Sequence, residues 1–284
     1  MRFHQPDTVD GAARLLAADE GARCVAGGAT LVAMMNADLV APSALVSLRG
    51  IAELEAIERC SDGSVRIGAM ARHRAVAAFA GYDGGQAVLA EAAAAIGHPA
   101  IRNMGTIGGA IAHADAAADY PACLVAADAA VEIAGAGARR EVGAADFFVD
   151  DLETALDPGE LVVGVRLPPA PGAAGAYAKL ARVEGDFATV SAAAIVAMEG
   201  DVCRDIRLAV GACASTPVRV AAAEDLLEGS RLEAADIDRA AAAIVAACDP
   251  VSDFRGSAAY RLVLVPVMLR RAVAAARQRA GPGR

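Results

Sequence analysis

The chain is organised around residues 101–119. It reads Ile101-Arg-Asn-Met-Gly-Thr-Ile-Gly-Gly-Ala-Ile-Ala-His-Ala-Asp-Ala-Ala-Ala-Asp119. Glycine lets a backbone approach a ligand closely, and neighbouring N–H groups can surround an anion. The glycines around Thr106 therefore predict either a cradle for a phosphate-bearing cofactor or a tight loop between two elements. Asp119 precedes Tyr120-Pro121, so we expect its side chain to cap a helix over residues 121–127.

A second glycine cluster lies earlier in the chain, in residues 23–36. It reads Arg23-Cys-Val-Ala-Gly-Gly-Ala-Thr-Leu-Val-Ala-Met-Met-Asn36. The pattern predicts a strand, a turn at Gly27-Gly28 and a helix that begins at Thr30 or Leu31. A strand–glycine–helix transition leaves backbone N–H groups unpaired at the positive end of the helix dipole, which suits a pyrophosphate. By itself this cluster could also be a tight strand–helix connection, because it matches neither the G-x-G-x-x-G pattern nor a P-loop.

The composition indicates a large globular protein with an alanine-rich core. The chain has 284 residues, which is long enough for two domains or one large one. Of these residues 56% are hydrophobic and only 4% aromatic. The formal net charge of −9 argues against nucleic acid or an anionic membrane surface as a partner. No apolar run reaches the roughly 18 residues that span a bilayer, and no secretory signal is apparent. These features predict a cytoplasmic protein without membrane insertion.

The sequence offers no pattern for a metal site or for catalytic side chains of its own. The six cysteines have no C-x-x-C pair, and the four histidines are dispersed, so neither matches a zinc or iron–sulfur site. We expect reduced cysteines in the core. We also expect no Ser-His-Asp set, so any redox chemistry belongs to a cofactor.

A proline-rich segment, Pro168-Pro-Ala-Pro-Gly-Ala-Ala-Gly175, predicts the boundary between two domains. Before it we expect helices over residues 7–16, 70–79 and 86–96, the last ended by His98-Pro99, and strands over 44–48, 54–57, 64–67, 130–134, 139–142 and 161–168. After it we expect strands over residues 175–179, 190–198 and 205–210, then helices over 221–227, 237–248 and 257–278. His73, between Arg72 and Arg74, is expected to face solvent.

Together the two glycine clusters are more specific than either alone. Ala26-Gly-Gly-Ala-Thr-Leu31, residues 101–109 and Asp119-Tyr-Pro121 resemble the flavin-binding medium subunit of molybdenum hydroxylases. That family includes carbon monoxide dehydrogenase medium subunits and the FAD domain of xanthine dehydrogenase. Residues 177–182, 186–188, 211–219 and 252–261 resemble further signatures of the family, so the resemblance covers nearly the whole chain.

The resemblance implies an α+β fold in two domains. Residues 1–174 would form a two-part FAD-binding domain of the PCMH type, with subdomains of about 1–57 and 58–174. Residues 175–284 would form a smaller C-terminal domain with a short antiparallel sheet and helices.

The resemblance also implies which residues hold FAD. Both loops would contribute backbone N–H groups around the pyrophosphate and ribityl chain, and one acidic and two basic side chains would contact the ribityl chain, the pyrophosphate or the ring. The implied residues are Ala26, Gly27, Gly28, Ala29, Thr30, Leu31, Thr106, Ile107, Gly108, Gly109, Ala110, His113, Asp119 and Lys179. Thr106 could instead brace its loop, and His113 could be a packing residue. Ala29, Ala110 and Ala116 depart from the family pattern, which leaves the backbone donors in place but removes side-chain contacts. We expect Gly108→Val to weaken FAD binding by blocking the approach of the backbone to the cofactor.

The implied function is electron transfer. A large subunit with the molybdenum cofactor would hydroxylate a substrate, and a small subunit with two [2Fe–2S] clusters would pass the electrons to FAD on this chain. The final acceptor would be NAD, a quinone or oxygen, and the complex would be a dimer of heterotrimers. Two alternatives stay open: a stand-alone FAD-dependent oxidase or reductase, and a non-catalytic scaffold that has lost FAD.

Overall fold

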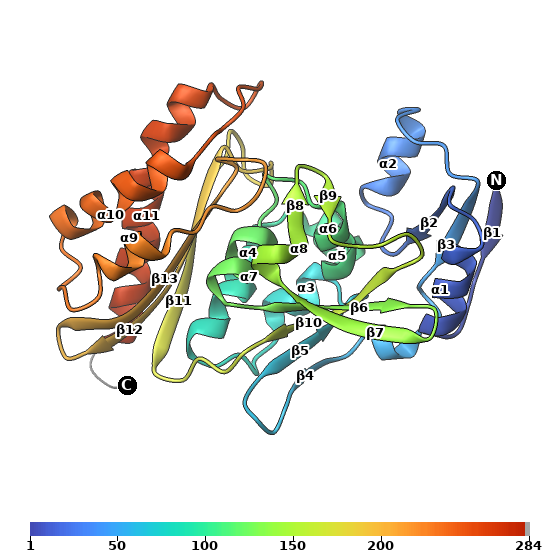
Figure 1. Ribbon diagram of the computed structural model, residues 1–284, viewed down its shortest axis with the longest axis horizontal. Helices are drawn as coiled ribbons and strands as arrows, with labels where there is room; N and C mark the ends of the chain where they lie inside the picture. The colour runs from blue at the N-terminus through green and yellow to red at the C-terminus, as the bar shows by residue number, and fades with distance from the viewer. Residues whose placement is uncertain (282–284) are drawn as a thin grey trace.

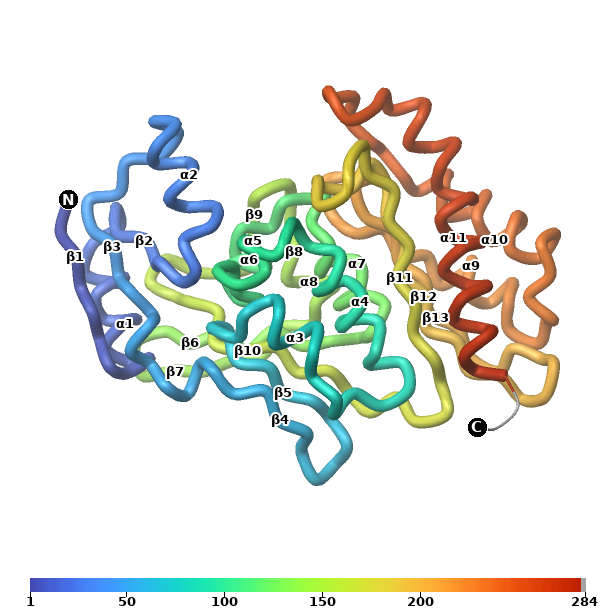
Figure 2. The backbone as a smooth tube through the Cα atoms, turned by 180° about the vertical axis from the view of Figure 1, so that it is seen from behind, coloured from blue at the N-terminus to red at the C-terminus, as the bar shows by residue number. Residues whose placement is uncertain are grey.

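The computed structural model describes residues 1–281 and has the expected α+β fold. Three sheets follow one another along the long axis of the molecule, each with its own helices (Figure 1). The N-terminal sheet lies at one end, a five-stranded sheet in the middle, and the C-terminal sheet with its long helix at the other end. The tube seen from behind has the same order (Figure 2).

The N-terminal sheet is small and entirely parallel. Its strands are β1 (Arg2–His4), β3 (Ala44–Ser47) and β2 (Ala22–Val25), in the order β1-β3-β2. Helix α1 (Val9–Ala17) packs its apolar face on this sheet, and helix α2 (Leu31–Asn36) connects β2 to β3. The expected strand–helix–strand unit is therefore confirmed. Strand β1 was not expected, because three residues are too few for a hydrophobic period to be recognised.

The central sheet is antiparallel and carries the main core. Its order is β4 (Ile57–Arg59), β5 (Val65–Gly68), β10 (Leu161–Leu167), β6 (Ala130–Gly135) and β7 (Ala138–Gly143). Its core also contains helices α4 (Val88–Ala95), α6 (Ile107–His113), α7 (Tyr120–Ala126) and α8 (Ala144–Phe147). Short elements complete this part: η1 (Ala52–Leu54), η2 (Gly84–Ala87), α3 (His73–Ala78), α5 (Pro99–Met104), β8 (Phe148–Asp150) and β9 (Glu153–Thr154).

The C-terminal sheet is covered on both faces. Its strands β11 (Ala173–Leu180), β12 (Val190–Glu199) and β13 (Val202–Gly211) form the expected antiparallel sheet. In β12, Ala193 and Ile195 belong to the central core, whereas Ala192, Ala194 and Val196 face the helices α9 (Ala221–Asp225), α10 (Ala234–Ala247) and α11 (Ala258–Ala280). A strand buried on both faces is continuously apolar rather than alternating, which explains the run of small residues in β12.

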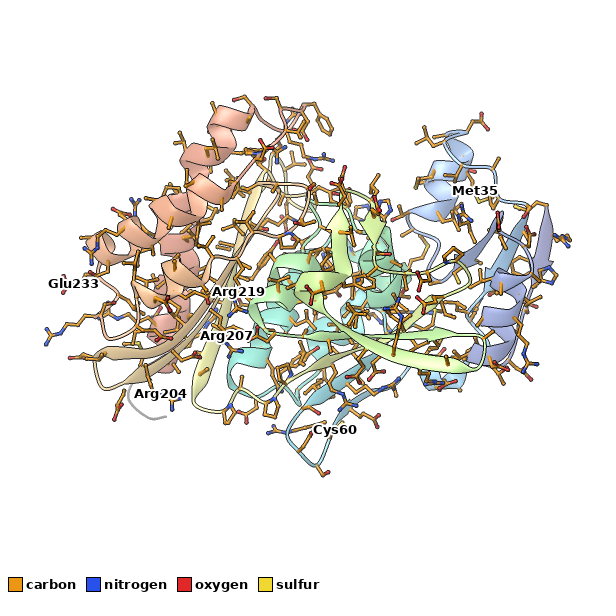
Figure 3. All side chains as sticks on the ribbon, viewed as in Figure 1. Met35, Cys60, Arg204, Arg207, Arg219 and Glu233 are labelled. Carbon is orange, nitrogen blue, oxygen red and sulfur yellow. The ribbon has the colours of Figure 1, made fainter. Side chains whose placement is uncertain are left out.

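Polar contacts add to this packing between the C-terminal sheet and the central part. Arg207 on β13 pairs with Asp128, which follows α7, at 3.0 Å. Arg219 pairs with the same carboxylate and donates to the carbonyl oxygen of Val125 at 3.1 Å. Figure 3 labels both arginines at this junction. Arg219 also pairs with Glu224 at 2.8 Å, so this one side chain connects the C-terminal part to the end of α7.

One predicted helix start is wrong. The helix expected from residue 70 begins only at His73, because residues 69 and 70 form a turn after β5, closed by the bond from Ala71 N to Gly68 O. The carbonyl oxygens of residues 69 and 71 accept hydrogen bonds from the backbone of residues 108 and 107. The helix expected over residues 86–96 does end before His98-Pro99, as α4. Pro99 then begins α5, where a residue without an N–H loses no hydrogen bond.

Among residues 1–281, no helix combines the length and apolar character needed to cross a membrane. Over the same residues, no three His, Cys, Asp or Glu side chains come together as a possible metal site.

The buried Arg261 joins three loops of the C-terminal part. Its guanidinium donates to the carbonyl oxygens of Thr189 at 2.6 Å and Ala212 at 3.1 Å and pairs with Asp253 at 2.6 Å. Its side chain is only 4% exposed, and Thr189 and Ala212 are buried, so their two carbonyl oxygens have no water to replace it.

We expect Arg261→Met to lower the free energy of unfolding by about 2–4 kcal/mol, because it leaves buried acceptors without a donor. Urea denaturation measures this loss. The control is Arg270→Met, which breaks an exposed pair with Asp238 and is expected to cost less than about 1 kcal/mol. Equal losses in the two variants would contradict the role of Arg261.

Candidate functional site

The two glycine clusters, far apart in the sequence, touch in the structure. A Cβ atom on Gly27 would lie 2.0 Å from the Met104 carbonyl oxygen and 2.9 Å from Gly105 Cα. A Cβ on Gly109 would lie 3.8 Å from the Cβ of Ala26. Residue 27 must therefore be glycine for the loops to meet, and together they form one site.

The first loop, residues 26–31, has free backbone donors. Within residues 1–281, no hydrogen bond uses the N–H of Gly27, Gly28, Ala29 or Thr30. Gly28 has φ of +76°, which turns the chain, and the Thr30 side chain makes no capping bond to α2. Successive unpaired N–H groups in a partly exposed turn are a suitable environment for a phosphate.

The second loop, residues 105–110, uses most of its donors within the protein. The N–H groups of Ile107 and Gly108 donate to the carbonyl oxygens of Ala71 and Ala69, at 3.0 and 2.9 Å. Those of Gly109 and Ala110 donate to the side chain and the backbone of Thr106. Thr106 thus caps α6, as the alternative bracing role predicts. What this loop can offer a ligand is a close approach at the exposed Gly109, rather than a row of free donors.

Gly108 serves packing within the protein. A Cβ at this position would lie 2.4 Å from the Cβ of Ala69. A valine here would push α6 away from residue 69, and this displacement is a further reason to expect Gly108→Val to weaken FAD binding.

His73 lies beneath the second loop and does not face solvent. It is 4% exposed, and its Nδ1 is 3.0 Å from the hydroxyl of Tyr120. Its backbone N–H donates to the carbonyl oxygen of Gly105, and a Cβ on Gly105 would lie 2.5 Å from its Nε2. The expectation of solvent exposure is wrong because α3 begins at His73, which turns its side chain inward.

Asp119 joins the central part to the C-terminal sheet. Its buried carboxylate accepts hydrogen bonds from the hydroxyl of Tyr177 at 2.7 Å and the Nζ of Lys179 at 3.0 Å. It makes no capping bond to α7, so the expected side-chain cap is wrong. Burial raises the pKa of Asp119, and the positive charge of Lys179 and the Tyr177 hydrogen bond oppose that rise. Lys179 also donates to the carbonyl oxygen of Ala95, so its charge has two partners.

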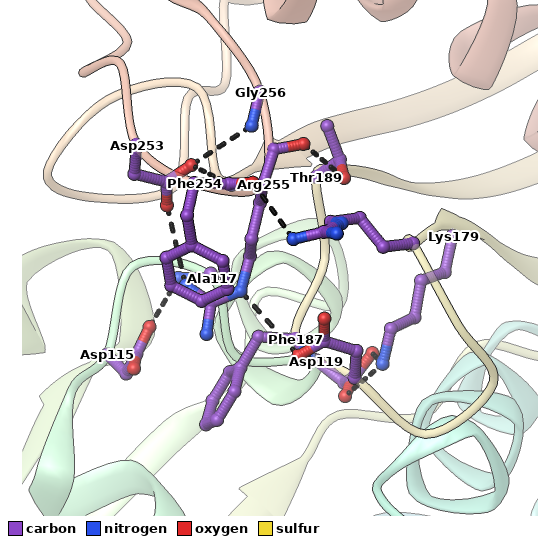
Figure 4. A network of polar contacts seen from close by, with 12 residues as sticks. Asp115, Ala117, Asp119, Lys179, Phe187, Thr189, Asp253, Phe254, Arg255 and Gly256 are labelled. Atoms are coloured by element: carbon purple, nitrogen blue, oxygen red, sulfur yellow. Dashed lines mark hydrogen bonds and ion pairs between the residues drawn. The ribbon is translucent and has the colours of Figure 1, made fainter.

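A cluster of aromatic and charged side chains joins the segment between β11 and β12 to the segment before α11 (Figure 4). The guanidinium carbon of Arg255 is 4.3 Å from the ring centre of Phe254 and 5.3 Å from that of Phe187. Arg255 also approaches Asp186 at 3.6 Å and Asp253 at 3.4 Å. Sequence reasoning missed Arg255, although it lies within the C-terminal signature over residues 252–261.

The structure brings most of the predicted site residues together, but Asp119 and Lys179 lie apart from the glycine loops. Residues 26–31 and 105–110 form one contact region, and His113 lies one helical turn beyond Gly109 on the partly exposed face of α6. Asp119, at the start of α7, and Lys179, on β11, form a separate polar group (Figure 4). The candidate residues therefore lie in two groups, one at the glycine loops and one where α7 meets β11.

Burial lowers the pKa of His73 to about 4, and the positive charge of Arg102 contributes. Between the ordinary value of 6.5 and about 4, the unfolded chain binds a proton that the folded chain does not. The free energy of unfolding therefore decreases as pH falls through this interval, by about 3 kcal/mol in total.

We expect His73→Gln, which cannot take up this proton, to lose less stability than the unchanged protein between pH 7 and pH 4. Urea denaturation of both proteins at several pH values measures the difference. Parallel pH profiles would show that His73 is not held neutral by the fold.

Comparison with known proteins places these features in a family. Residues 1–170 match the FAD binding domain in molybdopterin dehydrogenase, and residues 175–276 match the CO dehydrogenase flavoprotein C-terminal domain. The chain is 39% identical to the 6-hydroxypseudooxynicotine dehydrogenase complex subunit alpha of Paenarthrobacter nicotinovorans, over 97% of this chain and 94% of that one. It is 38% identical to the carbon monoxide dehydrogenase medium chain of Afipia carboxidovorans, over 98% and 97%.

The structure agrees with the sequence comparison. A crystal structure of the Cu,Mo-CO dehydrogenase contains a chain that superposes with a TM-score of 0.95 and 37% identity, covering 98% of both chains. The chain therefore belongs to the FAD-binding medium subunits of the molybdenum-containing oxidoreductases.

Proposed function

We propose that this chain is the electron-transfer subunit of a molybdenum hydroxylase. It takes electrons from the [2Fe–2S] clusters of a partner subunit and passes them to an external acceptor. The observation that carries the proposal is the contact between the two glycine loops, with four free N–H donors in the first, in a chain of an FAD-binding family.

In this proposal the two loops hold the pyrophosphate end of FAD. The free N–H groups of the first loop surround the phosphates, while Gly109 permits close approach from the second. His113, Asp119 and Lys179 act further along the site. The proposed contact residues are Ala26, Gly27, Gly28, Ala29, Thr30, Leu31, Thr106, Ile107, Gly108, Gly109, Ala110, His113, Asp119 and Lys179.

When bound, FAD supplies redox chemistry, accepting electrons from one partner and releasing them to another. The residues of this chain bind and orient it. The Asp119–Lys179 pair keeps a buried positive and a buried negative charge together, so this end of the site carries no uncompensated charge. Tyr177 fixes the carboxylate by donating its hydroxyl hydrogen.

Of the three departures from the family pattern, only Ala29 keeps a backbone donor that is free within residues 1–281. The N–H of Ala29 is free, whereas that of Ala110 is bonded to Thr106 and that of Ala116 to Asp151 at 3.3 Å. We propose that this site holds its cofactor with backbone groups more than with side chains.

The proposed partners are a large subunit with the molybdenum cofactor and a small subunit with [2Fe–2S] clusters, assembled as a dimer of heterotrimers in the cytoplasm. The names of two relatives, a carbon monoxide dehydrogenase medium chain and a nicotine 6-hydroxylase medium subunit, support such an assembly. NAD, a quinone or oxygen is the proposed acceptor. We also propose that residues 1–174 and 175–284 are the two domains, with subdomains of about 1–57 and 58–174 in the first.

We expect Gly109→Asp to raise the dissociation constant (Kd) for FAD at least about tenfold, because a carboxylate on this exposed residue would repel the pyrophosphate. Gly109→Ala, which adds only a methyl group, is expected to cost much less. Titration of the FAD-free protein, followed by flavin fluorescence, measures both.

Ala136→Asp is the matched control, because it adds the same charge to the exposed turn between β6 and β7. Equal Kd values for Gly109→Asp and Ala136→Asp would contradict the placement of the second loop. An unchanged protein that is colourless and takes up no FAD would contradict the function itself.

We expect the chain purified from its native host to bring with it subunits that contain molybdenum and iron–sulfur clusters. Metal analysis and the visible spectrum of the purified complex measure this. The isolated yellow chain is expected not to oxidise a substrate. A partner-free chain that turns over a small substrate would instead support a stand-alone flavin oxidase or reductase.

A further inference from the structure

We propose that His73 is a positioning residue of the FAD site, acting through its hydrogen bond to Tyr120. This inference rests on the proposed function, because it assigns a role within the same site. His73 need not touch the cofactor: it holds the second glycine loop in register with the segment that carries Asp119.

The backbone around His73 already fixes the second loop. Residues 69–73 run alongside residues 105–108, and three hydrogen bonds connect the two segments: Gly108 N to Ala69 O at 2.9 Å, Ile107 N to Ala71 O at 3.0 Å, and His73 N to Gly105 O at 3.1 Å. The position of the second loop therefore follows the position of residues 69–73.

The side chain of His73 extends this connection into the core. Its Nε2 lies against Gly105, where a Cβ would be only 2.5 Å away. On the other side, its Nδ1 is 3.0 Å from the hydroxyl of Tyr120, a residue with no exposed surface. With no exposed surface, that hydroxyl cannot replace the imidazole with bulk water.

Tyr120 connects His73 to the far end of the site. It directly follows Asp119, whose carboxylate holds Tyr177 and Lys179 of the C-terminal sheet. A continuous path thus runs from Gly105 through His73 and Tyr120 to Asp119. If FAD spans both ends of the site, loss of the central hydrogen bond changes the spacing between the groups that hold it.

Deleting the hydroxyl tests the path with the smallest change. We expect Tyr120→Phe to raise the Kd for FAD about fivefold to tenfold and to alter the visible circular dichroism of bound FAD. The matched control is Tyr82→Phe, because the Tyr82 hydroxyl is also buried but has no hydrogen-bond partner within residues 1–281. The control is expected to bind FAD as the unchanged protein does.

Substitutions at His73 separate positioning from general stability. Asparagine places its amide near the position of Nδ1 and can keep the bond to Tyr120, whereas leucine cannot. We expect His73→Leu to weaken FAD binding as much as Tyr120→Phe, and His73→Asn to recover most of the loss. The double variant His73→Leu/Tyr120→Phe is expected to be no weaker than either single variant, because both remove one interaction.

Three results decide the matter, each measured on the full chain together with the thermal midpoint of the FAD-free protein. Unchanged Kd values in folded Tyr120→Phe and His73→Leu would refute the inference and leave the proposed function standing. If Tyr120→Phe fails to fold, equal Kd values for His73→Leu and His73→Asn would refute it. If the unchanged protein binds no FAD, the proposed function fails, and this inference fails with it.

Discussion

The close approach of Gly27 to the Met104 carbonyl oxygen is the constraint on which the site depends. It brings the turn after β2 against the end of α5, although β2 belongs to the N-terminal sheet and α5 to the central part of the molecule. No side chain mediates this approach, so it tolerates no residue larger than glycine. The free N–H groups of the first loop and the exposed Gly109 of the second consequently share one surface. Neither loop offers both a row of donors and a close approach, and only the pair supplies them together.

The packing of the C-terminal sheet fixes the part of the site that contains Asp119 and Lys179. Strand β12 is apolar on both faces because it is packed between the central core and the helices α10 and α11. That packing fixes the neighbouring β11, and with it Tyr177 and Lys179, against Asp119. A buried carboxylate with one hydroxyl donor and one ammonium partner is satisfied in only one relative position of the two parts. The small side chains of β12 and the Asp119–Lys179 pair therefore both fix how the C-terminal sheet packs against the central part.

The fold was largely predictable from the sequence, and the residues of the site were less so. Periodicity and turn residues predicted the three C-terminal strands and the β2–α2–β3 unit, because these patterns are local. The sequence could not show that the N–H groups of Ile107 and Gly108 are bonded, since their acceptors, Ala69 and Ala71, lie in another segment. The same reason explains the error at Asp119, whose partners are remote in sequence and outcompete a local cap. Whether these residues contact FAD stays a prediction.

Helix α2 is exposed and open to substitution, unlike the glycine turn that precedes it. None of its residues is buried, and Val32 is 44% exposed. Surface positions of this kind can be exchanged with little effect on folding, whereas Gly27, only a few residues before, cannot. Mutational tolerance therefore changes abruptly within one short segment of the chain. Homologous proteins can diverge in α2, and with it in the surface beside the cofactor loop, while the loop itself stays the same.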